Sequence, residues 1–120
     1  RDVYKRQGIW SNKELIGVIG LHYLDLVNKT TSIGYYLAED FQKKGIMTKC
    51  TKALIRYVYE VYDINRIEIR MSTKNKKSRA IPIRLGFTQE GILRSNERLQ
   101  GEFSDSYVFS LLREECTYTR

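Results

Sequence analysis

The sequence contains few of the residues that build covalent or metal-bound frameworks. It has two cysteines, one histidine and one proline among its 120 residues. Cys50 and Cys116 lie far apart and belong to no Cys-x-x-Cys motif, which argues against a disulfide framework and against a zinc site. His22 stands alone in an alternating apolar stretch, without ligands at metal-site spacing. We therefore predict two free thiols, a histidine on a strand and no bound metal.

Long hydrophobic runs are missing as well. No run approaches the roughly 18 apolar residues that cross a bilayer, and no stretch has the organisation of a secretory signal. With 42% hydrophobic and 29% charged residues, the composition is typical of one compact domain. We expect a soluble, cytoplasmic protein with no membrane partner.

The net charge of +7 suits nucleic acid, an anionic cofactor or an acidic protein, and composition does not choose among them. Residues 1–7 have no initiating Met and no periodicity, and they resemble translated adapter sequence. We predict that they form a non-native leader and that the domain covers residues 8–115. Leaving out the leader removes three basic residues and one acidic residue, so the basic excess becomes moderate.

The first half of the chain predicts three strands followed by a helix and a fourth strand. Residues 9–14 and 15–25 indicate a hairpin, and the β-branched and aromatic residues 32–37 indicate a third antiparallel strand. Residues 48–62 have helical periodicity, and residues 66–71 alternate polar with apolar. This strand-helix-strand unit predicts a parallel pair with a right-handed crossover. The predicted apolar face of the helix comprises Leu54, Tyr57, Val58 and Val61.

The second half predicts a short helix and two strands. Asn75 is a good N-cap for a helix that runs to Leu85, and Gly86 suits the left-handed position after it. Pro82 inside a helix costs about 3 kcal/mol, so we expect this helix either to be kinked or to start later than the cap indicates. Strands are predicted at 87–94, with a continuation to Leu99 left open, and at 106–112.

The segment Gln42-Lys43-Lys44-Gly45-Ile46-Met47-Thr48 lies between a predicted strand and a predicted helix. A glycine-containing turn at this place leaves backbone N–H groups unpaired and directs the positive end of the helix dipole to one point. Such a turn can bind a diphosphate through the main chain. A single glycine before a helix is also typical of an ordinary turn, so the segment alone leaves both interpretations open.

Four segments together resemble the GNAT superfamily of acetyltransferases. The segment 42–48 is similar to its pyrophosphate loop, and Gly34-Tyr35-Tyr36-Leu37, Asn75-x-x-Ser78 and Arg84-Leu85-Gly86-Phe87 recur there in the same order. With Gly91-Ile92-Leu93-Arg94, the likeness is to the RimJ/RimL type and covers about residues 8–115. It implies an α/β (α+β) fold: a mixed, mostly antiparallel sheet flanked by helices, with a splayed parallel pair of strands at the cofactor site.

The resemblance implies acetyl-CoA as the co-substrate. The residues that it assigns to the pyrophosphate, largely through main-chain contacts, are Gln42, Lys43, Lys44, Gly45, Ile46, Met47 and Thr48. Backbone groups of Tyr36 and Leu37 would pair with the pantetheine and polarise the thioester carbonyl. Asn75 would hold the pantetheine from the other side. Met47 stands where the superfamily has a small residue, although this branch often has a larger one.

The implied chemistry is direct attack of an amine on the thioester. Many members of the superfamily use a tyrosine seven residues after the Asn as the thiolate donor, and Pro82 occupies that place here. In RimL-like enzymes the residue matching Ser78 is the proposed donor and the one matching Glu97 the proposed base, so both are our candidate catalytic residues. Alternatively, Ser78 completes the helix cap, Glu97 is a solvated carboxylate paired with Arg94 or Arg98, and water takes the proton.

The implied acceptor is a protein N-terminal amine, favoured on a ribosomal protein, with a polyamine or another small amine as the runner-up. A non-catalytic acyl-CoA-binding module stays open, as does a homodimer. A nucleic-acid-binding domain is disfavoured because no common motif supports it; its phosphate-facing patch would comprise Lys43, Lys44, Lys74, Lys76 and Lys77.

Members of this superfamily normally have a first strand and one or two helices before the region that starts at Gly8. We therefore expect the chain to be N-terminally truncated, with an exposed apolar face on its first hairpin and weak or no turnover.

Overall fold

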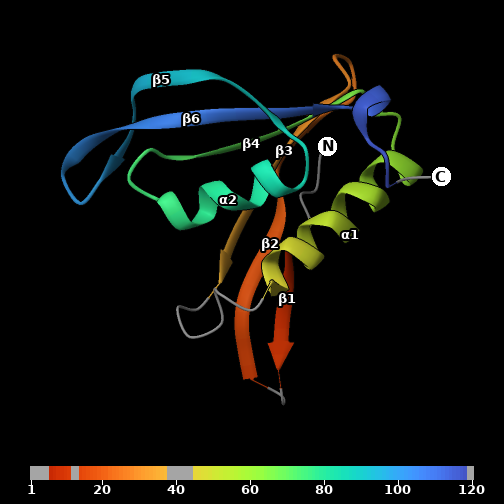
Figure 1. The fold of residues 1–120 in the computed structure, drawn as a ribbon, viewed down its shortest axis with the longest axis horizontal. Helices are drawn as coiled ribbons and strands as arrows, with labels where there is room; N and C mark the ends of the chain where they lie inside the picture. The colour runs from red at the N-terminus through yellow and green to blue at the C-terminus, as the bar shows by residue number, and fades with distance from the viewer. Residues whose placement is uncertain (1–5, 12–13, 38–44, 119–120) are drawn as a thin grey trace.

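The computed structural model describes residues 6–11, 14–37 and 45–118. They form one six-stranded sheet in the order β1-β2-β3-β4-β6-β5, with two α-helices and a final 3-10 turn (Figure 1). The strands are β1 (Arg6–Ser11), β2 (Glu14–Asp25), β3 (Thr30–Leu37), β4 (Arg66–Ser72), β5 (Thr88–Leu99) and β6 (Glu102–Leu112). The helices are α1 (Ile46–Val61), α2 (Lys76–Arg84) and the 3-10 turn η2 (Arg113–Glu115). The expected mixed sheet with its flanking helices is confirmed.

The sheet separates into two halves between β3 and β4. These two strands are its parallel pair, and their register runs only from Thr30 opposite Arg66 to Ile33 opposite Ile69. Beyond that point β3 continues beside β2, and β4 continues beside β6. Figure 1 shows β1 and β2 running across the direction of β5 and β6. The split confirms the predicted splayed pair, and in the part of the chain that the structure describes neither strand has another strand on its inner side beyond this point.

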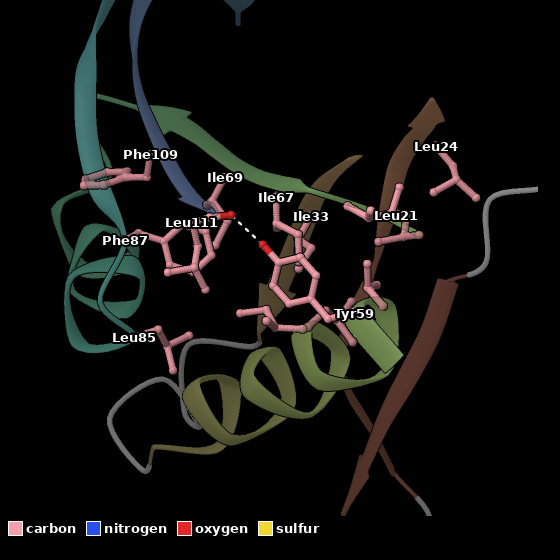
Figure 2. Close-up of a cluster of buried hydrophobic side chains, with 14 of the residues drawn as sticks. Leu21, Leu24, Ile33, Tyr59, Ile67, Ile69, Leu85, Phe87, Phe109 and Leu111 are labelled. Atoms are coloured by element: carbon pink, nitrogen blue, oxygen red, sulfur yellow. Dashed lines mark hydrogen bonds between the residues drawn. The ribbon is translucent and has the colours of Figure 1, made fainter. Parts of the chain in front are cut away.

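The core lies between α1 and the sheet. The helix buries Met47, Thr51, Ile55, Val58 and Tyr59 against a group of sheet residues that includes Ile33, Ile67, Ile69, Phe109 and Leu111. Figure 2 shows the Tyr59 hydroxyl donating to the carbonyl oxygen of Leu111, at 2.5 Å. Burial of a side chain such as Ile55, which is fully buried, contributes roughly 1.5–3 kcal/mol. This packing fixes the direction in which the first turn of α1 points.

The predicted apolar face of α1 is partly wrong. Val58 is buried, but Tyr57 and Val61 are 44% and 56% exposed. The helix starts at Ile46, two residues before the predicted start, and its buried stripe includes Thr51. The predicted face also left out the buried Ile55 and Tyr59 and included the exposed Tyr57 and Val61, so it was rotated about the helix axis.

Pro82 lies inside α2, which starts directly after the Asn75 cap, so the expectation of a later start is wrong. A proline has no N–H for the carbonyl of the residue four places before it, here Ser78. The Tyr35 hydroxyl donates to that carbonyl oxygen at 3.1 Å. A side chain from β3 thus replaces the missing helical hydrogen bond.

The largest differences from the predicted strand bounds are at the starts of β6 and β1. β6 starts at Glu102 instead of residue 106, because Gln100 and Gly101 both have positive φ, 50° and 82°, and form the tight turn of a long hairpin with β5. β1 starts at Arg6, so the sheet includes two residues that the sequence analysis left out of the fold. The non-native leader at residues 1–7 stays a prediction. The expected apolar face of the first hairpin depends largely on side chains outside the described set.

Candidate active site

A cavity of about 390 Å³ lies between the end of β3, the start of α1 and α2. We call it the helix cavity. The predicted cofactor-site residues that line it are Tyr36, Gly45, Met47, Thr48 and Asn75. Lys77 and Arg84 also line it, and no described acidic residue does. The cavity therefore favours an anionic ligand.

Gly45 starts α1 in a left-handed conformation, with φ 70° and ψ 7°. Non-glycine residues rarely adopt this conformation, so the local backbone geometry explains why a glycine occupies position 45. The first helical hydrogen bond is donated by the Lys49 N–H to the Gly45 carbonyl oxygen at 3.2 Å. The N–H groups of Ile46, Met47 and Thr48 precede this bond and carry the positive end of the helix dipole. Because the Met47 side chain is 3% exposed and belongs to the core, this residue can offer a ligand only its main chain.

The other predicted cofactor residues have mixed outcomes. Gln42, Lys43 and Lys44 lie outside the described residues. Leu37 is the last residue of β3 and pairs with Gly17 of β2, so its free backbone side faces the split in the sheet.

A second cavity, of about 420 Å³, opens where β3 and β4 separate. We call it the sheet cavity. Glu97 and Asn96 of β5, Arg70 of β4 and His22 of β2 line it. Tyr35, Asn75 and Ser78 line both cavities. The structure thus brings the two candidate catalytic residues, Ser78 and Glu97, to one cavity, and it places Ser78 where the two cavities meet.

Ser78 and Glu97 are held in place by different backbone contacts. The Asn75 side-chain oxygen accepts a hydrogen bond from the Ser78 backbone N–H at 3.2 Å, so the helix cap uses the Ser78 main chain and not its hydroxyl. Glu97 follows an irregular segment of β5, where the register shifts and the Ser95 N–H donates to Asp105 at 2.8 Å. Among the described residues, Glu97 forms no ion pair with Arg94 or Arg98. Within the described ranges, neither the Ser78 hydroxyl nor the Glu97 carboxylate has a hydrogen-bond partner.

Tyr35 is one of the three residues that line both cavities, and the sequence did not single it out as a site residue. Burial raises the pKa of its hydroxyl well above the ordinary value, so it stays a hydrogen-bond donor. It is the donor to the Ser78 carbonyl and thereby fixes α2 against β3. Pro82 was the signal for this contact, because a helix interior with a proline has a carbonyl that needs another donor.

His22 and Arg70 were also missed as residues of a cavity. His22 lies at a bulge in β2, where the register with β3 shifts. Its imidazole lies directly over Gly34, where an added Cβ would come 2.0 Å from Nε2. Arg70 belongs to the alternating pattern of β4, which predicted a strand but not its position beside the split. Among the described residues, no group of three or more His, Cys, Asp or Glu could hold a metal ion.

A family model described as an acetyltransferase (GNAT) domain matches residues 3–88. The chain belongs to the GNAT acetyltransferase family. YdaF of Bacillus subtilis (strain 168) is 41% identical over 108 residues, covering 90% of this chain and 59% of YdaF. The ribosomal-protein-serine acetyltransferase of Escherichia coli (strain K12) is 33% identical over 102 residues, covering 85% of this chain and 57% of that protein.

A solved GNAT structure has the same fold. RimL, a ribosomal L7/L12 alpha-N-protein acetyltransferase in complex with coenzyme A, superimposes with a TM-score of 0.84 at 32% identity, covering 91% of this chain and 62% of that one. The chain thus spans less than two thirds of the relatives and of the solved structure named here. Acetyltransferases of this family use acetyl-CoA. The N–H groups at the start of α1, together with Lys77 and Arg84, are suitable donors for its diphosphate.

Neither α-helix of the described ranges is long and apolar enough to cross a membrane.

Proposed function

We propose that this GNAT domain transfers the acetyl group of acetyl-CoA to a primary amine, and that the amine is the N-terminus of a protein, with ribosomal proteins favoured. The observation that carries the proposal is the junction of the two cavities at Ser78. A donor that enters through the basic helix cavity and an acceptor that enters through the sheet cavity meet at this junction. The names of the relatives, which include acetyltransferases of ribosomal proteins, support the choice of acceptor.

The residues divide the reaction between them. The start of α1 binds the diphosphate, and the backbone at Tyr36 and Leu37, on the free side of β3, holds the pantetheine and polarises the thioester carbonyl. Glu97 takes a proton from the acceptor ammonium, and the neutral amine then forms the new C–N bond as the C–S bond breaks. The Ser78 hydroxyl protonates the departing thiolate and regains a proton from the acetylated nitrogen, which loses its second proton as the amide forms. The products are the acetylated amine and CoA.

The nucleic-acid alternative has little support. Lys77 lines the helix cavity, and the Lys74 Nζ lies 3.8 Å from a carboxylate oxygen of Glu102, so both lysines lie beside other groups of the domain. The non-catalytic alternative keeps the helix cavity but gives Glu97 and Ser78 no role. It differs from our proposal in turnover and not in acetyl-CoA binding.

Two measurements test the proposed function in sequence. Calorimetric titration of acetyl-CoA at low and moderate salt, with an oligonucleotide as control, should show saturable binding that survives moderate salt. Mass spectrometry should then show one added acetyl group on the α-amine of an N-terminal peptide, at a rate that falls in both Glu97→Gln and Ser78→Ala. Salt-sensitive binding of the oligonucleotide alone would contradict the proposal. If the wild type and both variants bind acetyl-CoA and acetylate the peptide at equal rates, Glu97 and Ser78 have no catalytic role.

A further inference from the structure

Arg70 places a positive charge at the sheet cavity. Its neighbours Ile69 and Met71 are buried in the core beneath the helices, and successive residues of a strand point to opposite faces. The Arg70 side chain therefore points away from the helices, where 44% of its surface is exposed, and it lines the cavity together with Glu97. The cavity thus contains one fixed cation and one carboxylate.

A network on β4 and its neighbours holds the Arg70 side chain in place. The Arg70 Nε–H donates to Oε1 of Glu68 at 3.1 Å. The other Glu68 oxygen accepts two hydrogen bonds from Arg66, at 3.0 and 2.9 Å, and Arg66 in turn pairs with Glu90. Only one of the five N–H donors of Arg70 is used, and within the described ranges its terminal nitrogens have no partner. The guanidinium is therefore oriented but still able to bind a ligand.

The two charges suit one class of amine better than another. In a peptide N-terminus, a carbonyl oxygen lies close to the ammonium, so Glu97 can bind the nitrogen while Arg70 binds the oxygen. A polyamine has further ammonium groups and no oxygen, and Arg70 repels them. We propose that Arg70 binds the acceptor oxygen nearest the reacting amine and thereby selects a peptide N-terminus over a polyamine. This inference rests on the proposed function.

The test measures acceptor binding without requiring turnover. The chain is saturated with CoA, and a short lysine-free peptide with a free α-amine or spermidine is titrated into it by calorimetry. We expect the peptide to bind more tightly than spermidine. Arg70→Met should reduce this preference about tenfold, as expected for a lost hydrogen bond to a charged group. Arg70→Lys keeps the charge but loses the planar fork, so it should still exclude spermidine while binding the peptide less well.

Arg94→Met is the matched control, because Arg94 is an exposed arginine of β5 that does not line the sheet cavity. It makes the same change in net charge and should leave the preference unchanged. If Arg70→Met keeps its fold, its CoA affinity and the wild-type preference for the peptide over spermidine, the inference about Arg70 is wrong and the proposed function is unaffected. The same conclusion follows if the wild-type chain binds CoA but prefers spermidine. Absence of CoA binding would overturn the proposed function together with this inference.

Discussion

The helix cavity and the sheet cavity meet at Ser78, yet they are built from different material. The helix cavity presents the main chain at the start of α1, with Gly45 in a left-handed conformation, beside the basic residues Lys77 and Arg84 of α2. The sheet cavity presents side chains from several strands and contains both signs of charge. The comparison teaches that a main-chain site depends on a local motif, whereas a side-chain site depends on the register of distant strands.

Replacing Glu97 should have the largest effect and should separate the two cavities most sharply. In Glu97→Gln the carboxylate that takes the amine proton is lost, so we expect the acetylation rate to fall about 10²- to 10⁴-fold. Acetyl-CoA affinity should not change, because Glu97 does not line the helix cavity. Single-turnover mass spectrometry and calorimetry measure the two quantities. Glu102→Gln is the control, because Glu102 is an 80% exposed carboxylate of β6. If the acetylation rate of Glu97→Gln falls less than threefold, water and not Glu97 takes the proton from the amine.

Tyr35 tests whether the cavities depend on a shared contact. Tyr35→Phe leaves the Ser78 carbonyl without its donor, so the free energy of unfolding should fall by about 1–3 kcal/mol. Pro82→Ala supplies an N–H to the same carbonyl, and the double variant should therefore recover much of the loss. Urea unfolding of the wild type, the two single variants and the double variant gives the four free energies of a double-mutant cycle. Strictly additive effects would show that Tyr35 and Pro82 are not coupled through Ser78.

Gly45 tests the main-chain cavity by itself. Gly45→Ala places a Cβ on a residue with φ 70°, at a cost of roughly 1–2 kcal/mol. Apart from the chain neighbours of Gly45, no heavy atom of the described residues lies within 4 Å of the added Cβ, so the expected cost comes from the local backbone conformation. We expect lower stability and weaker acetyl-CoA binding, while Gly45→Asn, which tolerates this conformation better, should lose less. Equal losses in both variants would contradict the conformational explanation.

The smallest effect concerns the network that holds Arg70 at the sheet cavity. Hydrogen bonds from Arg66 and Ser110 lower the pKa of Glu90 to about 2 from an ordinary 4.5. The stability that they provide is therefore present above about pH 4.5 and is lost as the pH falls toward 2. Because the Glu90 side chain is 40% exposed, we expect the change to be below about 1 kcal/mol. Unfolding free energies between pH 5 and 2 should decline less steeply in Glu90→Gln than in the wild type.

The sequence analysis predicted most of the fold and the main-chain part of the site. Periodicity and β-branched residues indicated α1 and the strands, and the Asn75 cap with Gly86 indicated α2. The resemblance to the GNAT superfamily pointed to Gly45, Asn75 and Ser78. It did not anticipate Tyr35, His22 or Arg70 at the cavities. The positions of His22 and Arg70 depend on a bulge in β2 and on where β3 and β4 part, and such tertiary features leave no local signal. Tyr35 had an indirect signal in Pro82, whose place inside a helix leaves a carbonyl that needs another donor. The cytoplasmic location and the homodimer stay predictions.

The most direct test of the two-cavity account is to follow the backbone amides by NMR while each ligand is added separately. Acetyl-CoA should shift the amide signals of Gly45, Met47, Thr48 and Ser78 first and leave Glu97 and Arg70 nearly unchanged. A peptide N-terminus added to the CoA complex should then shift Glu97, Arg70 and Ser78. The account would be contradicted if acetyl-CoA shifted only the amide signals of sheet-cavity residues, or if both ligands shifted the same set of amide signals.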